Sequence, residues 1–231
     1  MSVLISINSI RKCKSFVIVL HPEHGYLLLE SNKSRNRHKE GENYQLPGGR
    51  LDIVDFNVME NSPKETLFQN KRLVNVEEIV FKSCVARELY EETGLDYRKR
   101  LEKFEKLNFN SSDRFRFFVL KISNKDNLLL NTYLSDNYSW SWSLINILCN
   151  NYCSKFYNFV LCKTGILTKC SGDIEFYLKL SSEHKSFLFE NRHEKIPIMI
   201  KNHSKGICSK TFERYILYGI DKQKKTQFED K

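Results

Sequence analysis

The chain has 231 residues, of which 41% are hydrophobic and 13% aromatic, a content that supports a packed core and excludes global disorder. Its 37 Lys and Arg against 28 Asp and Glu give a net charge of +9. That charge favours polyanionic partners such as nucleotides, RNA or inositol phosphates, although a basic surface without a dedicated partner has the same signature. The length predicts one domain over residues 1–231 that carries insertions.

The cysteines and the first residues indicate the compartment. Seven cysteines without paired spacing predict reduced thiols in a cytoplasmic compartment, with a nuclear one as the alternative. Residues 1–20 are broken by Arg11-Lys12-Cys13-Lys14 and predict no signal peptide. No apolar run approaches the ~20 residues that a membrane-spanning helix requires. Nothing in the pattern predicts an oligomeric state.

The first elements are two strands and a basic loop. Residues 16–20 and 26–30 are apolar runs that predict a hairpin, with residues 22–25 as its turn. Residues 32–42 form a polar loop, which is either a contact for phosphates or nucleic acid or a solvated linker. Its candidate substrate-binding cations are Lys33, Arg35, Arg37 and Lys39.

A glycine turn and a long helix follow. Residues 46–49 read Leu-Pro-Gly-Gly, and the glycines let a backbone carbonyl approach a metal ion or a phosphate, although a tight turn without a ligand would look the same. Residues 51–75 are polar and irregular, which predicts an insertion. A helix is predicted from Asn75 or Val76 to about Thr93, with a buried side that includes Val80 and Cys84.

The acidic end of that helix is the strongest chemical signal. Glu88, Glu91 and Glu92 stand at i, i+3 and i+4, so they share one helix face and repel one another. A cluster of carboxylate oxygens is the ligand set that Mg²⁺ or Mn²⁺ prefers. Gly94 stands where a left-handed C-cap would end the helix. The alternative is a solvated acidic helix end without a metal ion.

The second half of the chain predicts fewer functional residues. Residues 104–109 and 114–122 are predicted strands, residues 125–172 a second insertion that is helical around 144–161, and residues 175–180 a further strand. Trp140 and Trp142 are candidates for stacking on a base or for packing on the core. A zinc site is a weaker alternative, built from cysteines and histidines without a Cys-x2-Cys pair: Cys149, Cys153, Cys162, Cys170, His184 and His203.

The C-terminal residues predict a closing helix. Residues 209–220 are amphipathic, and Gly219 is expected to end the helix. Residues 221–231 are expected to form a charged, frayed tail.

Residues 87–95, Arg-Glu-Leu-Tyr-Glu-Glu-Thr-Gly-Leu, resemble the second half of the box that defines the Nudix family, Gly-x5-Glu-x7-Arg-Glu-(apolar)-x-Glu-Glu-x-Gly-(apolar). Residues 44–50 resemble the start of that box. In an uninterrupted box the Arg would stand at position 63 rather than 87, so 24 residues are inserted. Counted back from Arg87, the loop Glu of the box would be position 79, which is Ile. Either Glu78, Glu77 or neither takes its role.

The resemblance implies a fold and an activity. The fold would be α+β, a Nudix-type α/β/α sandwich around a mixed β-sheet with two insertions. The activity would be hydrolysis of a phosphoanhydride bond in a nucleoside diphosphate linked to another group, in a nucleotide, dinucleotide, RNA cap or diphosphoinositol polyphosphate. The alternative is a catalytically inactive Nudix-fold module that binds RNA or a partner protein.

The resemblance also implies roles for individual residues. Mg²⁺, or Mn²⁺, would be bound by the carbonyl of Gly49 and by carboxylates of the box. Glu183-His184, followed by Phe189, is similar to a loop of the family that often adds a ligand. The general base would be Glu91 or Glu88 rather than Glu183, and Arg87 would orient a box Glu. The expected metal ligands are Gly49, Glu88, Glu91, Glu92 and Glu183, and the expected substrate contacts are Arg35, Arg37, Lys39 and Arg50.

Overall fold

A computed structural model of the chain describes residues 2–6, 10, 12–32, 43–58, 65–68, 71–107, 114–128 and 167–229. The strands are β1 Ser2–Ser6, β2 Lys14–His21, β3 Gly25–Ser31, β4 Tyr44–Gln45, β5 Gly48–Arg50, β6 Glu65–Phe68, β7 Lys71–Glu77, β8 Glu105–Lys106, β9 Phe115–Lys121, β10 Thr168–Lys169, β11 Tyr177–Leu178 and β12 His184–Glu190. The α-helices are α1 Glu78–Thr93, α5 Ile196–Met199 and α6 Ile207–Glu229. Short 3₁₀ helices are η2 Ile53–Val58, η3 Leu101–Lys103, η4 Asn124–Asp126 and η5 His203–Gly206.

The central sheet is mixed and has the order β12-β3-β2-β9-β8. The β2–β9 pair is parallel and the other pairs are antiparallel. Strands β2 and β3 pair with each other only next to their turn, at Leu20–Tyr26 and His21–Gly25. Farther from the turn, β2 pairs with β5 and β3 pairs with β4 instead. The two strands of the hairpin therefore separate with distance from their turn, and β4 and β5 lie between them.

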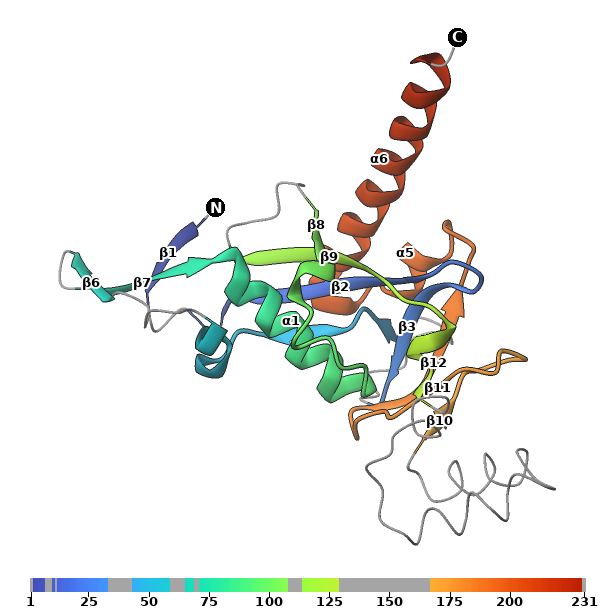
Figure 1. The fold of residues 1–231 in the computed structure, drawn as a ribbon, viewed down its shortest axis with the longest axis horizontal. Helices are drawn as coiled ribbons and strands as arrows, with labels where there is room; N and C mark the ends of the chain where they lie inside the picture. The colour runs from blue at the N-terminus through green and yellow to red at the C-terminus, as the bar shows by residue number, and fades with distance from the viewer. Residues whose placement is uncertain are drawn as a thin grey trace, which may run out of the picture.

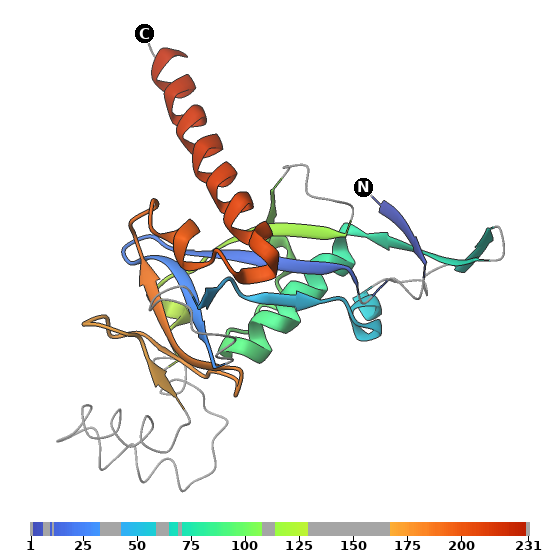
Figure 2. The ribbon, with the colours of Figure 1, turned by 180° about the vertical axis from the view of Figure 1, so that it is seen from behind.

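Helices cover both faces of this sheet. Helix α1 lies across one face, and α5 with the first turns of α6 lies on the other, as the two opposite views show (Figures 1 and 2). The layers are thus helix, sheet and helix, and the predicted α+β sandwich around a mixed sheet is confirmed. None of the helices in the described part of the chain combines the length and apolarity that a membrane crossing requires.

Successive apolar side chains of the central strands pack alternately into the two cores, one on each face of the sheet. In β2, Val17 and Val19 pack on the α1 side, whereas Phe16 and Ile18 pack on the α6 side. Successive side chains of a strand point to opposite faces, so an entirely apolar strand supplies two cores at once. Fully burying each such side chain contributes about 1.5–3 kcal/mol. The same alternation recurs in β3 and β9.

The prediction for residues 51–75 was wrong in part, because β6 and most of β7 lie within them. Strand β7 pairs with β6 as a hairpin and with β1 on its other edge. Figure 1 shows this three-stranded unit at one end of the molecule. Strand β7 also continues to Glu77, so α1 begins at Glu78 rather than at Asn75 or Val76. A strand that gains its hydrogen bonds from residues far along the chain leaves little local signal.

The other strands agree with the predictions to different extents. The hairpin strands and residues 114–122 were predicted correctly to within a few residues. Residues 104–109 form a strand only at Glu105–Lys106 among those that the structure describes, and residues 175–180 only at Tyr177–Leu178. The predicted helix at 144–161 and both tryptophans lie outside the described residues.

The predicted closing helix at residues 209–220 is confirmed, but the prediction of its end and of the tail was wrong. Helix α6 runs through Gly219 to Glu229, so the glycine does not end it and residues 221–229 are helical. A glycine inside a helix costs only about 1 kcal/mol relative to Ala. The residues after Gly219 include Lys and Gln, which favour helix, and no proline follows.

Candidate functional site

Helix α1 presents its acidic face because its other face is buried. Its buried side chains include Val80, Phe81, Cys84, Val85 and Leu89. At its end Gly94 adopts the left-handed conformation, with φ of 76°, and its N–H donates to the carbonyl of Tyr90 at 2.8 Å. The helix therefore stops where the glycine predicted, one turn beyond the carboxylates.

The glycine strand β5 lies directly against these carboxylates. The backbone N–H of Gly48 donates to Oε2 of Glu92 at 2.9 Å. A Cβ atom on Gly49 would lie 2.4 Å from the carboxyl carbon of Glu88, so this carboxylate occupies space that only glycine leaves open. The helix and the glycine turn, which the sequence placed at one site, are therefore in contact.

Arg87 connects the acidic side chains with one another. Its Nη1 lies 3.0 Å from Oε1 of Glu88 and 3.1 Å from Oε2 of Glu91. Its Nη2 donates to the backbone carbonyl of Arg50 at 3.1 Å. A planar guanidinium offers five N–H donors in a fixed geometry, so Arg87 fixes the helix carboxylates relative to β5.

Asp55 is the residue that the sequence analysis missed. Its buried carboxylate accepts two hydrogen bonds from Arg87, from Nε at 2.8 Å and from Nη2 at 3.1 Å. Asp55 stands six positions after Gly49, where the box pattern places its loop Glu. Counting forward from the glycine would have found it, whereas counting back from Arg87 passes through the insertion. The 24 inserted residues therefore lie between Asp55 and Arg87.

The two glutamates considered for that role lie elsewhere. Glu78 makes ion pairs with Lys106 at 3.0 Å and with Lys82 at 3.6 Å, and these lysines lower the pKa of its carboxyl group, against the effect of burial. Glu77 is exposed at the end of β7. The hydrogen bonds of Arg87 go instead to Asp55, Glu91 and the backbone carbonyl of Arg50.

The last turn of α1 brings a second segment to the site. Its carbonyls at Glu92 and Thr93 accept backbone N–H groups from Ser181 at 3.2 Å and Lys179 at 3.0 Å. This holds the turn that carries Glu183 next to Glu92. The following residue, His184, is buried, and its Nε2 lies 3.8 Å from Oε1 of Glu92.

His184 is itself held on both ring nitrogens. Its Nδ1 lies 3.1 Å from the hydroxyl of Ser181, and its Nε2 contacts the side-chain amide of Gln45. The imidazole therefore joins β4, β12 and the end of α1.

The electrostatics of the site favour a cation. Burial raises the pKa of Glu92 well above its usual value, and the charges of Glu88, Glu183 and Glu91 raise it further, while the Gly48 N–H opposes them. Burial also raises the pKa of Glu88, against the effect of Arg87. A carboxylate surrounded by other carboxylates is costly to ionise unless a positive charge is added. The four carboxylates thus form one strongly negative site.

The donor set fits Mg²⁺ or Mn²⁺. All the side-chain donors are carboxylate oxygens, which these ions prefer. Glu88 and Glu92 keep 19% and 12% of their side-chain surface exposed and Glu91 keeps 54%, so solvent reaches each of them. The Gly49 carbonyl faces α1, where Sγ of Cys84 lies 4.0 Å away. It is therefore on the same side of β5 as the carboxylates.

Some predicted site residues are not brought together here. Arg50 contributes its backbone carbonyl, and its side chain is exposed. Arg35, Arg37 and Lys39 lie outside the described residues, as do Cys149, Cys153 and Cys162. Within the described part of the chain, the remaining candidate zinc ligands, Cys170, His184 and His203, do not form a group that could hold a metal ion.

No family model and no curated protein matches the sequence. Among solved structures, the chain is similar to an Ap4A hydrolase of C. elegans, with 11% identity and a TM-score of 0.38 over 88% of this chain and 98% of that chain. It is also similar to a MutT protein of Methanosarcina mazei Go1, with 16% identity and a TM-score of 0.35 over 88% of this chain and 93% of that chain. Both are Nudix hydrolases. Because both TM-scores lie below 0.5, these likenesses assign neither an activity nor a substrate.

Proposed function

We propose that the chain is a Nudix-type pyrophosphohydrolase that requires Mg²⁺ or Mn²⁺. Its substrate would be a nucleoside diphosphate linked to another group. The observation that carries the proposal is the meeting of Glu88 and Glu92 with the Gly48-Gly49 strand, in which Arg87 binds both strand and helix. Carboxylates that repel one another and are nevertheless held against the same strand by fixed hydrogen bonds are expected where a bound cation is part of the function.

The chain's own residues would orient and deprotonate a water molecule. A divalent ion, when bound, neutralises charge on the phosphate oxygens and lowers the pKa of a coordinated water. Glu92 is oriented by the Gly48 N–H, and Glu88 by Arg87 and the open space at Gly49. We assign the proton acceptor to Glu88 or Glu91 rather than Glu183. Burial raises the pKa of the Glu88 carboxyl group, against the effect of Arg87, which makes it a stronger base than an exposed glutamate.

The substrate class follows from charge. A net charge of +9 favours substrates that carry several phosphates, so nucleotides, dinucleotides, RNA caps and diphosphoinositol polyphosphates are the compounds to test. We also propose a reducing compartment, the cytoplasm or the nucleus. The free thiols of three described cysteines support it: Cys84, Cys170 and Cys208.

The test is phosphate or nucleotide release from this panel, measured with and without Mg²⁺. We expect release from at least one compound, dependence on the metal ion, and loss of turnover in Glu88→Gln. If no compound is hydrolysed in Mg²⁺ or Mn²⁺ while RNA or a protein partner binds the same surface, the alternative of an inactive binding module replaces this proposal.

A further inference from the structure

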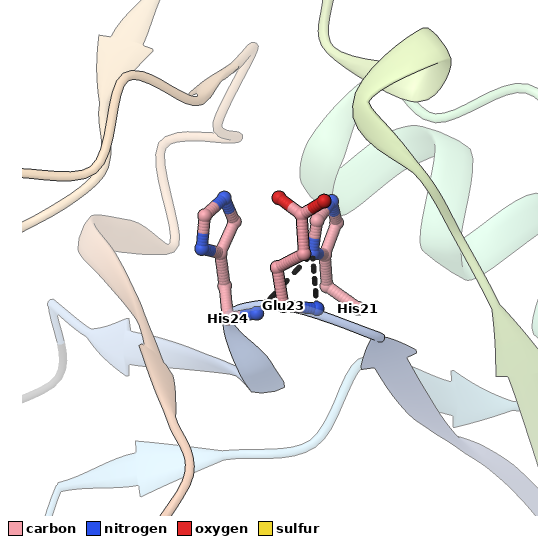
Figure 3. Close-up of side chains that lie close together, drawn as sticks. All are labelled: His21, Glu23 and His24. Atoms are coloured by element: carbon pink, nitrogen blue, oxygen red, sulfur yellow. Dashed lines mark hydrogen bonds between the residues drawn. The ribbon is translucent and has the colours of Figure 1, made fainter.

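A second candidate site lies at the turn between β2 and β3. One ring nitrogen each of His21 and His24 and one carboxylate oxygen of Glu23 all lie within 4.8 Å of one another. Figure 3 shows the two imidazole rings and the carboxylate projecting to the same side of the turn. This turn and the Glu88–Glu92 cluster involve different residues, so the site is separate from the proposed catalytic one.

His21 is fixed in place, and one of its ring nitrogens is poorly satisfied. Its ring is 1% exposed and contacts Phe176 and Phe189, with ring centroids 5.8 and 5.7 Å away. Its Nδ1 accepts the backbone N–H groups of Glu23 at 3.2 Å and His24 at 3.3 Å. Its Nε2 is buried and makes no hydrogen bond of acceptable geometry with the described residues, although the side chain of Asn124 lies close to the ring. A buried polar atom left without a partner costs about 1–3 kcal/mol, so it requires an explanation.

Glu23 and His24 border an open cleft of about 420 Å³, which the loop at Ser171–Gly172 and the end of β12, including Phe189 and Glu190, also line. Oε2 of Glu23 accepts a hydrogen bond from the side-chain amide of Asn124 at 3.3 Å, which metal binding would replace. Both side chains are at least partly exposed, in contrast to His21. The three candidate ligands thus connect a rigid, buried nitrogen to an accessible cleft.

We propose that His21, Glu23 and His24 bind a zinc-class divalent cation, with a further coordination position open toward the cleft. Two imidazoles and one carboxylate are a ligand set that holds Zn²⁺ while leaving one position free. Ligand atoms around tetrahedral zinc lie about 3.3 Å apart, so shifts of about 1–2 Å close these three residues around an ion. We assign Nε2 of His21 to the metal because this buried atom makes no hydrogen bond of acceptable geometry with a described residue.

Binding requires two specific rearrangements. The rings of His21 and His24 stack with centroids 4.3 Å apart and planes within 12°, so His24 has to rotate out of the stack to aim a nitrogen at the same ion. A neutral His21 carries its proton on Nε2, because Nδ1 accepts two hydrogen bonds. Metal binding at Nε2 requires this proton to move to Nδ1, which breaks the hydrogen bonds from the Glu23 and His24 N–H groups. Both changes are confined to the turn: the partly exposed His24 makes the rotation, and the buried ring of His21 makes the proton shift.

The experiment measures Zn²⁺ and Co²⁺ binding to the full-length protein by calorimetry and by Co²⁺ absorption, with excess Mg²⁺ present to occupy the carboxylate cluster. We expect one equivalent that His24→Ala and Glu23→Gln weaken by more than about 10²-fold, since even a residue that only supports a metal ligand contributes about 10–100-fold. His193→Ala is the matched control, because His193 is an exposed histidine outside the turn. It should keep the full affinity.

Nitrogen NMR of the histidines supplies an independent result. In the wild-type protein, zinc should move the His21 proton to Nδ1 and shift the amide signals of Glu23 and His24. His21→Asn serves as a third ligand variant if it folds, but the conclusion does not depend on it. Equal stoichiometry and affinity in wild type, His24→Ala and Glu23→Gln, or only weak binding shared by all proteins, would overturn the site. Phosphohydrolase turnover should not change in His24→Ala.

Discussion

Asp55 binds Arg87 through two hydrogen bonds, at 2.8 and 3.1 Å, across 32 residues of sequence. The Asp55 side chain is 1% exposed and that of Arg87 is 20% exposed. Arg87 also contacts Glu88 and Glu91, so the Asp55–Arg87 pair positions two of the four carboxylates of the site.

Asp55→Asn should weaken both the fold and the site. It removes the buried carboxylate partner of Arg87 and leaves only Glu88 and Glu91 to balance its charge, which costs about 1–3 kcal/mol. Turnover should fall about tenfold, since Arg87 then holds the helix carboxylates less well. Urea denaturation and steady-state kinetics measure the two effects. Asp96→Asn is the control: Asp96 pairs with Arg98 at the surface, where a pair is worth less than about 1 kcal/mol. Equal losses in the two variants would contradict the anchoring role.

Glu92→Gln should abolish metal-dependent turnover without unfolding the protein. The Gln amide oxygen can still accept the Gly48 N–H, and the repulsion from Glu88 and Glu183 disappears. We expect turnover to fall by more than about 10²-fold, with a melting temperature in metal-free buffer at or above that of wild type. Glu91→Gln should lose turnover similarly. Glu102→Gln, at an exposed position of η3, is the control. Unchanged turnover in Glu92→Gln would remove Glu92 from the site.

Gly49→Ala should act through Glu88. The new methyl group would lie 2.4–2.5 Å from the atoms of the Glu88 carboxyl group, which must therefore move. The Mg²⁺ concentration for half-maximal rate should rise about tenfold. A double-mutant cycle tests the cause, because adding Gly49→Ala to Glu88→Gln should have little further effect. Additive losses would show that the methyl group acts elsewhere.

His203 should make the protein less stable in mild acid. Burial lowers the pKa of His203 to about 3, and Lys14 and His184 contribute in the same direction. Its Nδ1 accepts the N–H of Leu46. Below a pH of about 6.5 the unfolded chain binds a proton that the folded chain excludes until about pH 3, so stability falls as the pH falls through this window. Between pH 6.5 and 5 the loss should be about 2 kcal/mol.

The variant His203→Asn keeps an acceptor for Leu46 but does not titrate, so it should lose this part of the acid sensitivity. His193→Asn, at an exposed position, should behave like wild type. Denaturant unfolding at several pH values makes the comparison. If wild type and His203→Asn show the same slope between pH 5 and 6.5, the ring is not kept neutral by the fold.

The basic loop should affect substrate binding rather than the chemical step. Its cations precede the Leu-Pro-Gly-Gly strand closely and can reach distal phosphates, in salt-screened contacts worth about 1 kcal/mol or less each. Neutralising four of them together should raise KM, flatten its salt dependence and leave kcat unchanged. A KM titration at low and moderate salt decides this. An unchanged KM would make the loop a solvated linker. The four are Lys33, Arg35, Arg37 and Lys39.

The sequence predicts the parts of this site whose rules are local. The spacing of Glu88, Glu91 and Glu92 and the stop at Gly94 follow from helix geometry alone, and the structure has both. Asp55 was missed because its position is defined relative to Gly49 and an insertion separates it from the helix. Residues 65–77 were missed as strands because their pairing partners include Ser2–Ser6, which no local pattern connects with them.

At Gly219, by contrast, the sequence predicts a helix end that the structure does not have. A rule that describes Gly94 correctly fails at Gly219, although both glycines follow an amphipathic run. The difference is in what comes next: the segment after Gly94 returns over the core at Leu95 and Tyr97, whereas α6 continues. A glycine permits the left-handed turn, and tertiary packing decides whether the chain takes it.

The splayed hairpin at the centre of the sheet also affects the order of events during synthesis. The outer edge of β2 pairs with β9, and that of β3 pairs with β12. Lys14 therefore cannot pair before Phe115 has been synthesised, and Ser31 cannot pair before His184 has been synthesised. At about 5–20 residues per second, the outer edges of these two largely apolar strands stay unpaired for on the order of ten seconds. Such exposed edges are where nascent chains associate with one another. The yield of folded protein should therefore depend on chaperone supply and growth temperature more strongly than its final stability implies.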